Sequence, residues 1–226
     1  GKEIIYGAEA LARWKKPDGT IVPPAYFIDS LEKIGYITEL DFYIFEEVLK
    51  TLDKWNRQKK RKIIISTNFS GRHFEGTGEE FLNRIAHVMS KYTVLPSNVE
   101  IEVTEGVLVK NVEVLRHCLN RLHDMGFRIA IDDFGTGYSS LSMLADMPSD
   151  VIKIDKSFIN VGMTDQKLKL LCEIGRMVKI LGKEIIIEGV ETKEQEQFLI
   201  DGGFACGQGF LCNRPVSLGE FERLYL

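Results

Sequence analysis

The chain has 226 residues, of which 44% are hydrophobic and 27% are charged, and its formal net charge at pH 7 is -4. These proportions are those of an ordinary soluble globular protein, long enough for one α/β domain with a large core. The slightly negative charge gives no general attraction for a nucleic acid polymer or an anionic membrane, so an anionic ligand must be held by local groups.

The cysteines and the apolar runs indicate the cellular compartment in which the chain folds. No C-x-x-C pair is present, which argues against a zinc site or a disulfide framework and favours a reducing environment. No apolar run approaches the ~18 residues needed to cross a bilayer, and the first residues do not resemble a signal peptide. We therefore expect a cytoplasmic domain that makes no membrane contact of its own, although a full-length protein can carry an anchor elsewhere.

Strand and helix patterns alternate from the start of the chain. The first half predicts a strand at 4–11, helices at 24–34 and 39–55, a strand at 63–68, a helix at 78–92, a strand at 99–103 and a helix at 112–125. Pro24 suits a first helical position, and Gly126 ends the last of these helices.

The alternation continues through the second half. It predicts a strand at 127–133, a helix at 139–147, a strand at 151–155, a helix at 165–181, a strand at 184–187, a helix capped by Thr192, a strand at 204–207 and a last helix capped by Ser217. Alternation with short connections indicates parallel strands covered by helices.

The predicted fold is a TIM-like (β/α)8 barrel, which needs eight strands. Seven are found, and the abrupt start at Gly1 predicts that the first strand of the barrel precedes this sequence. The alternative is an open doubly wound sheet, but the Gly-rich nucleotide loop expected after its first strand is absent.

Polar residues lie within or at the end of the predicted strands. They are Glu9, Asn68, Glu102, the adjacent Asp132 and Asp133, Lys153, Glu188 and Gln208. In a parallel barrel these strand ends share one face. Five carboxylates around one lysine would repel one another, and hard cations such as Mg²⁺ or Mn²⁺ would relieve the repulsion. Adjacent aspartates suit two ions about 3.5–4 Å apart, an arrangement used for attack on a phosphodiester.

Each of these residues also has a plainer interpretation. Glu9 alone could be a surface residue, and Gln208 could belong to a turn. Lys153 could pair with Asp155, or form a Schiff base as in barrel aldolases. The basic residues at 57–62 are better explained as a solvated helix end than as a nucleic-acid patch. The joint placement on one face favours a site over these separate explanations.

Seven motifs, in order and spacing, resemble the EAL domain, a family of phosphodiesterases that hydrolyse the bacterial second messenger cyclic di-GMP. The motifs are GAEALARW, NFS, EVTE, IDDFGTGYSSL, IKIDKSF, EGVET and QGFLCNRP. The resemblance covers nearly the whole chain. It implies that residues 1–226 are one EAL phosphodiesterase domain of the barrel type, without its first strand, from the C-terminal part of a larger signalling protein.

The resemblance further implies that cyclic di-GMP is opened to linear pGpG with two Mg²⁺ or Mn²⁺ ions, and that Ca²⁺ inhibits. It implies a homodimer and an N-terminal sensor or GGDEF domain in the full-length protein. Some family members have lost ligands and serve only as cyclic di-GMP receptors or scaffolds, so an inactive receptor is the alternative function.

Site residues follow from the same resemblance. One ion would be held by Glu9, Asn68, Glu102 and Asp132, and the second by Asp132, Asp133 and Glu188. The catalytic group would be Lys153, Glu188 and Glu9, with Lys153 holding or deprotonating the attacking water and Glu188 as the competing general base. Arg13, Gln208 and Pro215 would contact the substrate, and Glu105 would stabilise the loop after Asp133.

Overall fold

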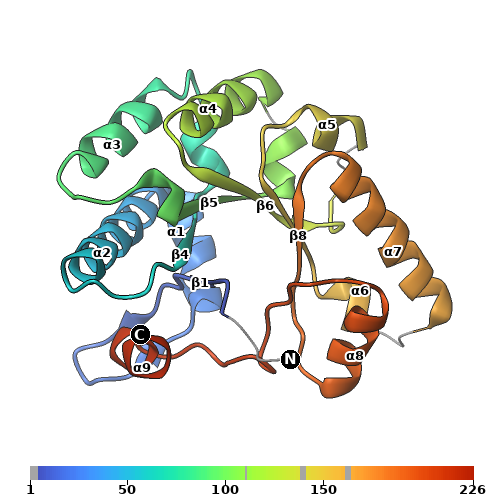
Figure 1. Ribbon diagram of the computed structural model, residues 1–226. Helices are drawn as coiled ribbons and strands as arrows, with labels where there is room; N and C mark the ends of the chain where they lie inside the picture. Colours follow the sequence, from blue (N-terminus) through green and yellow to red (C-terminus); the bar gives the residue numbers. More distant parts are fainter. Residues whose placement is uncertain (1–4, 110, 138–140, 161–163) are drawn as a thin grey trace.

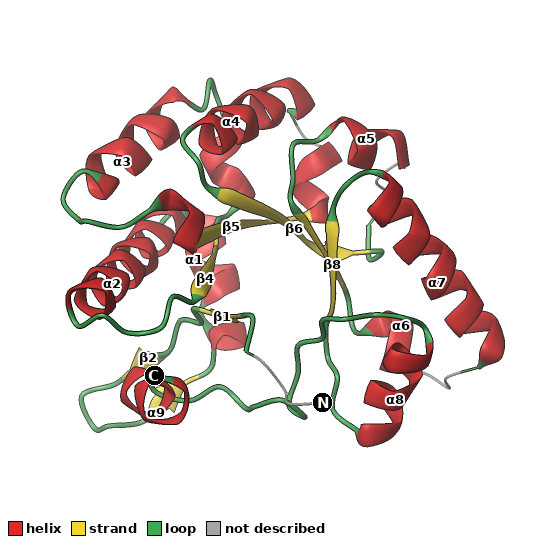
Figure 2. Cartoon of the chain, in the orientation of Figure 1, coloured by secondary structure: helices red, strands yellow, loops and turns green. Residues whose placement is uncertain are grey.

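The computed structural model describes residues 5–109, 111–137, 141–160 and 164–226. Its centre is a curled sheet of six parallel strands, ringed by helices on the outside (Figures 1 and 2). In sheet order the strands are β1 (Gly7–Glu9), β4 (Ile64–Asn68), β5 (Val99–Thr104), β6 (Arg128–Phe134), β7 (Val151–Ile154) and β8 (Glu184–Ile187). The parallel α/β architecture predicted from the alternation is confirmed, as part of a TIM-like barrel.

The helices cover the outer face of this sheet. They are α1 (Ile28–Ile34), α2 (Ile37–Arg57), α3 (Glu79–Met89), α4 (Val112–Asp124), α5 (Leu141–Asp146), α6 (Ser157–Asn160), α7 (Asp165–Ile180), α8 (Lys193–Asp201) and α9 (Leu218–Tyr225). Local sequence sets their ends: Thr192 and Gln195 form a capping box at α8, and the hydroxyl of Thr164 accepts a hydrogen bond from the amide of Lys167 at the start of α7.

The main core lies between the sheet and the helices. On the strands, Ile101 and Ile131 are fully buried, and Phe45 of α2 and Leu119 of α4 pack in the same cluster. Burial on both faces explains why β5, β6 and β7 consist largely of apolar residues with polar and charged ones among them. Among these, Glu102, Asp132 and Lys153 meet on the inner side of the sheet.

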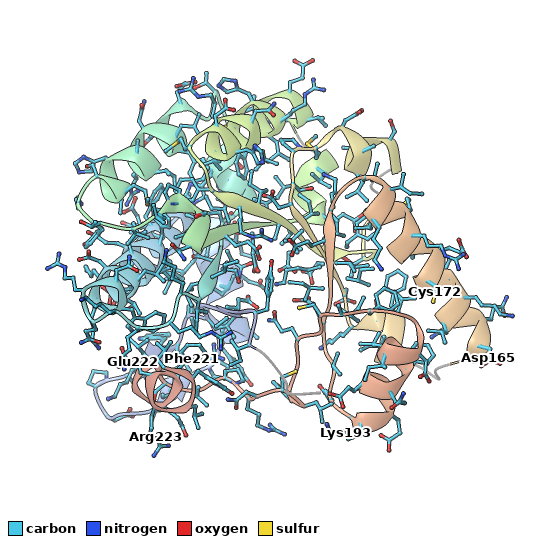
Figure 3. All side chains as sticks on the ribbon, in the orientation of Figure 1. Asp165, Cys172, Lys193, Phe221, Glu222 and Arg223 are labelled. Carbon is cyan, nitrogen blue, oxygen red and sulfur yellow. The ribbon has the colours of Figure 1, made fainter. Side chains whose placement is uncertain are left out.

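The last helix returns to the start of the barrel wall. Phe221 of α9 stacks on Trp55 of α2 with ring centroids 6.0 Å apart, and the Trp55 indole donates a 2.8 Å hydrogen bond to Glu222. Figure 3 labels Phe221 and Glu222 on this helix. No helix in the described parts of the chain is long and apolar enough to cross a membrane.

Two predicted elements differ from the structure, and one observed pair of strands was not predicted. The strand expected at 204–207 is wrong, because only Gly207 forms a bridge, to Ile187 of β8, before the chain turns away at Gly209 against the backbone of Val190. The helix expected at 24–34 is split into a 3-10 turn at Pro24–Tyr26 and α1.

A short antiparallel pair, β2 (Trp14–Lys15) and β3 (Ile21–Val22), surrounds the Asp18–Gly19 turn and was not predicted. Two-residue strands carry too few side chains for periodicity to reveal them. The start of the helix predicted at 139–147 falls partly outside the described residues.

Candidate active site

The C-terminal ends of the strands bring the predicted polar residues to one rim. Glu9 ends β1, Asn68 ends β4, Glu102 lies near the end of β5, and Lys153 lies in β7. Glu188 follows β8 directly. Parallel strands with the register of this sheet place these positions at similar heights, so residues far apart in sequence become neighbours.

Lys153 lies at the centre of the rim, with its side chain only 1% exposed. Its ammonium nitrogen lies 2.9 Å from Glu188, 3.0 Å from Glu102, 3.2 Å from Asp132 and 3.6 Å from Glu9. These four ion pairs hold the ammonium inside the rim. The four carboxylates come from four different strands or strand ends.

The simpler interpretation of Lys153 as a partner of Asp155 is wrong. The carboxylate of Asp155 instead accepts a 2.8 Å hydrogen bond from the amide of Ser157, at the start of α6. Lys153 points into the rim, whereas Asp155 lies in the connection between β7 and α6.

Burial and mutual repulsion shift the ionisation of the rim. Burial alone would lower the pKa of Lys153, but attraction by the four carboxylates outweighs it and raises the pKa above its ordinary value. Burial raises the pKa of Glu102 to about 8 and that of Glu188 to about 7, with Lys153 opposing both shifts. Burial and the charge of Asp132 also raise the pKa of Asp133.

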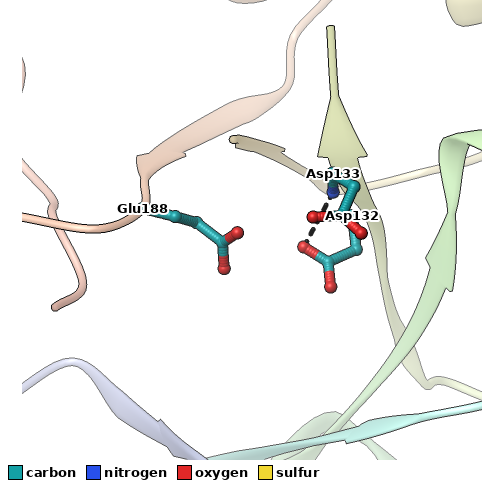
Figure 4. A group of neighbouring side chains, drawn as sticks. All are labelled: Asp132, Asp133 and Glu188. Carbon is teal, nitrogen blue, oxygen red and sulfur yellow. Dashed lines mark hydrogen bonds between the residues drawn. The ribbon is translucent and has the colours of Figure 1, made fainter. Parts of the chain in front are cut away.

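Asp132, Asp133 and Glu188 form a compact group of acids, shown in Figure 4. Each offers one oxygen, and these oxygens lie within 4.8 Å of one another. Neighbouring residues of a strand normally point to opposite faces. Here Asp133 adopts φ +55 and the pairing of β6 with β7 shifts between Ile131 and Phe134, so both aspartates serve the same site.

Amide side chains hold Glu9 in place. Asn68 donates to one carboxylate oxygen of Glu9 over 2.8 Å, and Gln208 donates to the other over 2.6 Å. The amide oxygens of Asn68 and Gln208 are left for other partners by this arrangement. Gln208 therefore lies in the rim, as predicted, although the strand before it is only a bridge.

The donor set fits hard divalent cations. It consists of carboxylate and amide oxygens, the ligands that Mg²⁺ and Mn²⁺ prefer. Glu102 is 1% exposed, and it is one of four acids that contact the single ammonium of Lys153, with Asp133 beside them. Cations bound here would ligate these buried carboxylate oxygens and offset the excess negative charge.

Glu105 anchors the turn that follows Asp133. It is 2% exposed, and one of its oxygens accepts hydrogen bonds from the amides of Gly135 at 2.8 Å and Gly137 at 2.9 Å. Gly135 has φ +98, and a side chain there would collide with the ring of Phe158. The turn is thus tightly constrained from two sides.

Arg13 and Pro215 stand apart from the acids. The guanidinium of Arg13 is exposed and donates to the carbonyl of Ala12 over 2.7 Å. Arg13 also lines a pocket of about 500 Å³ with aromatic walls that include Trp14 and Tyr43. Pro215 is exposed in the segment that leads to α9.

One set of interior residues received no role from the sequence. Arg128 and Glu100 bind each other over 3.2 Å inside the sheet, and they lie four and two residues, respectively, before the rim acids Asp132 and Glu102 on their own strands. The available signal was the period of two: Glu100 and Glu102 share a face, as do Arg128 and Asp132.

Comparison with known proteins gives concordant results. A sequence model described as the EAL domain matches residues 2–215. The signaling protein YkoW of Bacillus subtilis is 37% identical over 100% of this chain, which corresponds to 28% of YkoW. The cyclic di-GMP phosphodiesterase PdeR of Escherichia coli is 32% identical over 98% of this chain and 33% of its own length. The chain therefore spans about a third of these relatives.

Solved structures agree with the sequence matches. The PaMucR phosphodiesterase, determined as a c-di-GMP complex, has a TM-score of 0.88 and 31% identity, and the match covers 96% of this chain and 87% of that one. The EAL enzyme Bd1971, bound to cAMP and cyclic di-GMP, has a TM-score of 0.87 and 32% identity over 96% of this chain and 60% of its own.

Proposed function

The chain belongs to the EAL domain family, and from that premise we propose that it is a metal-dependent phosphodiesterase that hydrolyses cyclic di-GMP to linear pGpG. The observation that carries the proposal is the convergence of four acids on Lys153, with oxygens of Asp132, Asp133 and Glu188 within 4.8 Å of one another. The relative PdeR is named a cyclic di-GMP phosphodiesterase, and PaMucR was solved with c-di-GMP.

The proposed ligands divide into two overlapping sets. Glu9, Asn68, Glu102 and Asp132 would hold one Mg²⁺ or Mn²⁺, and Asp132, Asp133 and Glu188 would hold a second. When bound, such ions neutralise phosphate charge and lower the pKa of water. Ca²⁺ takes the same oxygen ligands with a larger, looser coordination, which supports inhibition by displacement.

Hydrolysis adds a water oxygen to phosphorus and breaks the bond from phosphorus to the 3′ oxygen, which leaves with a proton. Lys153, kept as an ammonium by its four carboxylate neighbours, can only donate, so it is proposed to hold and orient the water. A carboxylate must then accept the proton of the water. Glu188 is the most exposed of the four, at 18%, and is the proposed acceptor.

Arg13 is proposed to bind a substrate phosphate. Its exposed guanidinium offers paired N–H donors suited to phosphate oxygens. Gln208 and Pro215 are proposed to contact the substrate beside the rim. Glu105 is proposed to stabilise the loop that presents Asp133, which its two amide contacts support.

The wider assignments are proposals that rest on the family. They are a single EAL domain over residues 1–226, a homodimer, a cytoplasmic location and an N-terminal sensor or GGDEF domain in the full-length protein. The longer relatives support the last of these, because this chain matches only 28% of YkoW.

The test is conversion of cyclic di-GMP to pGpG with Mn²⁺, followed by nucleotide chromatography. Turnover by the wild type and its loss in Glu9→Ala support the proposal. Cyclic di-GMP binding without turnover identifies a receptor instead. Borohydride trapping of a carbonyl substrate on Lys153, without phosphodiesterase activity, would indicate an aldolase.

A further inference from the structure

The interior of the curled sheet has a charged layer toward each end of its strands, with apolar residues between the layers on β6, β7 and β8. The rim acids and Lys153 form the upper layer. Ala130, Val151 and Ile186, with Cys206 against them, form the apolar layer. Near the N-terminal ends of the strands lies a lower layer, defined as Tyr6, Glu100, Arg128 and Glu184.

Arg128 connects the lower layer. Its guanidinium contacts Glu100 at 3.2 Å, Glu184 at 3.2 Å and the hydroxyl of Tyr6 at 2.7 Å, and it lies 5.9 Å from the centre of the Tyr6 ring. The Tyr6 hydroxyl in turn donates to Glu184 over 2.5 Å. Glu100 is 3% exposed, so its charge depends on Arg128 for compensation.

Each member of the lower layer lies in, or directly beside, a strand that also carries an acid of the rim or ends next to one. Tyr6 comes three residues before Glu9 at β1, and Glu100 comes two residues before Glu102 on β5. On β6 and β8 the separation is four residues, from Arg128 to Asp132 and from Glu184 to Glu188, or about 13 Å along a strand. The same four strands are tied together at both levels.

The outer strands of the sheet depend most on these ties. β1 and β8 are the two ends of the strand order, and no backbone pairing joins them among the described residues. Side chains cross between the two edges at two levels: Tyr6 to Glu184 below, and Glu9 to Gln208, which bonds to the backbone of β8, above. The spacing of Glu9 and Glu188 on either side of Lys153 is therefore set by side-chain bridges.

We propose that the lower layer is a set of positioning residues that holds β1, β5, β6 and β8 at the spacing required by the acids of the rim. Its members make no printed hydrogen bond or ion pair with the rim acids or Lys153, and on β6, β7 and β8 the apolar residues Ala130, Val151 and Ile186 lie between the two levels. The kinetic part of this inference rests on the proposed phosphodiesterase function, whereas the structural part does not.

The experiment compares variants of the lower layer with a matched ion pair elsewhere. Tyr6→Phe keeps the ring and removes the hydroxyl. Arg128→Met removes the central cation. Arg84→Met is the control, because Arg84 also forms a two-point ion pair, with Glu39, and lies 4.1 Å from the centre of the Phe42 ring, between α2 and α3 outside the sheet.

A double variant separates positioning from simple loss of stability. Glu100→Gln combined with Arg128→Met removes the buried carboxylate together with its partner, so the unfolding stability recovers. If the layer positions the rim, the double variant still shows faster amide exchange at the rim, weaker Mn²⁺ binding and a lower kcat. If the layer only stabilises the fold, they disappear with the restored stability.

The readouts are taken at a temperature where every variant is folded. Hydrogen exchange in metal-free protein follows the amides of Ala10 and Gln208, which bond to the neighbouring backbone at the rim. We expect about tenfold faster exchange there in Tyr6→Phe and Arg128→Met, with about tenfold weaker Mn²⁺ binding by calorimetry. The kcat for cyclic di-GMP falls while KM stays within about twofold, because Arg13 is undisturbed.

Equal rim exchange in Arg128→Met, Tyr6→Phe and Arg84→Met would overturn the positioning role. A wild type without turnover would refute the proposed function and leave the exchange comparison to decide this inference. The two failures are thus distinguishable.

Discussion

The ammonium of Lys153 lies 3.0 Å from the carboxylate of Glu102, and both side chains are 1% exposed. This pair is the most deeply buried part of the rim, and it belongs to a group in which acids outnumber the cation. Stability, the proposed metal binding and the proposed catalysis therefore depend on the same few charges. Changing the pH or adding a metal ion should alter all three.

The first prediction concerns Lys153→Met in metal-free protein. Removing the ammonium leaves the buried Glu102 without a compensating charge, so the free energy of unfolding at pH 8 falls by about 3 kcal/mol. Urea unfolding in EDTA measures it. Lys50→Met, which removes an exposed ion pair with Glu47, is the control and changes stability by less than about 1 kcal/mol. Unchanged stability of Lys153→Met would show that the ammonium of Lys153 does not compensate the charge of Glu102.

The second prediction concerns pH. Folding raises the pKa of Glu102 from 4.5 to about 8 and that of Glu188 to about 7, so the folded protein binds more protons than the unfolded one in this range. Their stabilising contribution is complete below pH 4.5 and is lost as pH rises to about 8. Unfolding in EDTA from pH 5 to 8 should show this decline, with a smaller slope in Glu102→Gln.

Saturating Mn²⁺ should reverse that trend. Metal binding requires ionised carboxylates, so the stabilisation by Mn²⁺ grows as pH rises. The difference in melting temperature with and without Mn²⁺, measured across the same range, provides the test. A difference that is constant with pH would show that the rim acids are not the ligands.

The third prediction concerns the left-handed backbone of Asp133, with φ +55. Asparagine tolerates this conformation, whereas a β-branched residue does not. Asp133→Asn should therefore fold as stably as the wild type but lose about 100-fold in activity, because it removes a proposed ligand. Asp133→Val should also lose stability. The melting temperatures of both variants report backbone strain, and their turnover reports the loss of the proposed metal ligand.

The fourth prediction concerns Glu105→Gln. The neutral amide is a weaker acceptor for the amides of Gly135 and Gly137, so exchange at these two amides should accelerate and activity should fall by about 10–100-fold. Glu113→Gln, an exposed residue in the first turn of α4, serves as the control. Full activity together with rapid exchange of both glycines would show that an ordered turn is not required.

The gathering of polar residues at one rim could be predicted from the sequence, and the reason is physical. Strand and helix alternation implies parallel strands, and parallel strands place their C-terminal ends on one edge. Glu9, Asn68, Glu102 and Glu188 could therefore be assigned to one rim without coordinates. The predicted strand ends needed only approximate bounds for this, because a strand end that is wrong by one or two residues still lies at the rim.

Other features depend on contacts that no local pattern encodes. The strand at 204–207 failed because its apolar residues serve packing, with Phe204 against Gly175 of α7, instead of a ladder on β8. The β2–β3 pair could not be predicted from periodicity because its strands are two residues long.

The sequence by itself determined the parallel α/β order, the family and the residue types gathered at the strand ends, because periodicity and motif spacing are local properties of the chain. Only the tertiary structure decided that Lys153 faces four acids at once, that a shifted register turns Asp132 and Asp133 to one side, and that Arg128 ties the strands together below. These are distances between residues on different strands, and curvature of the sheet sets them.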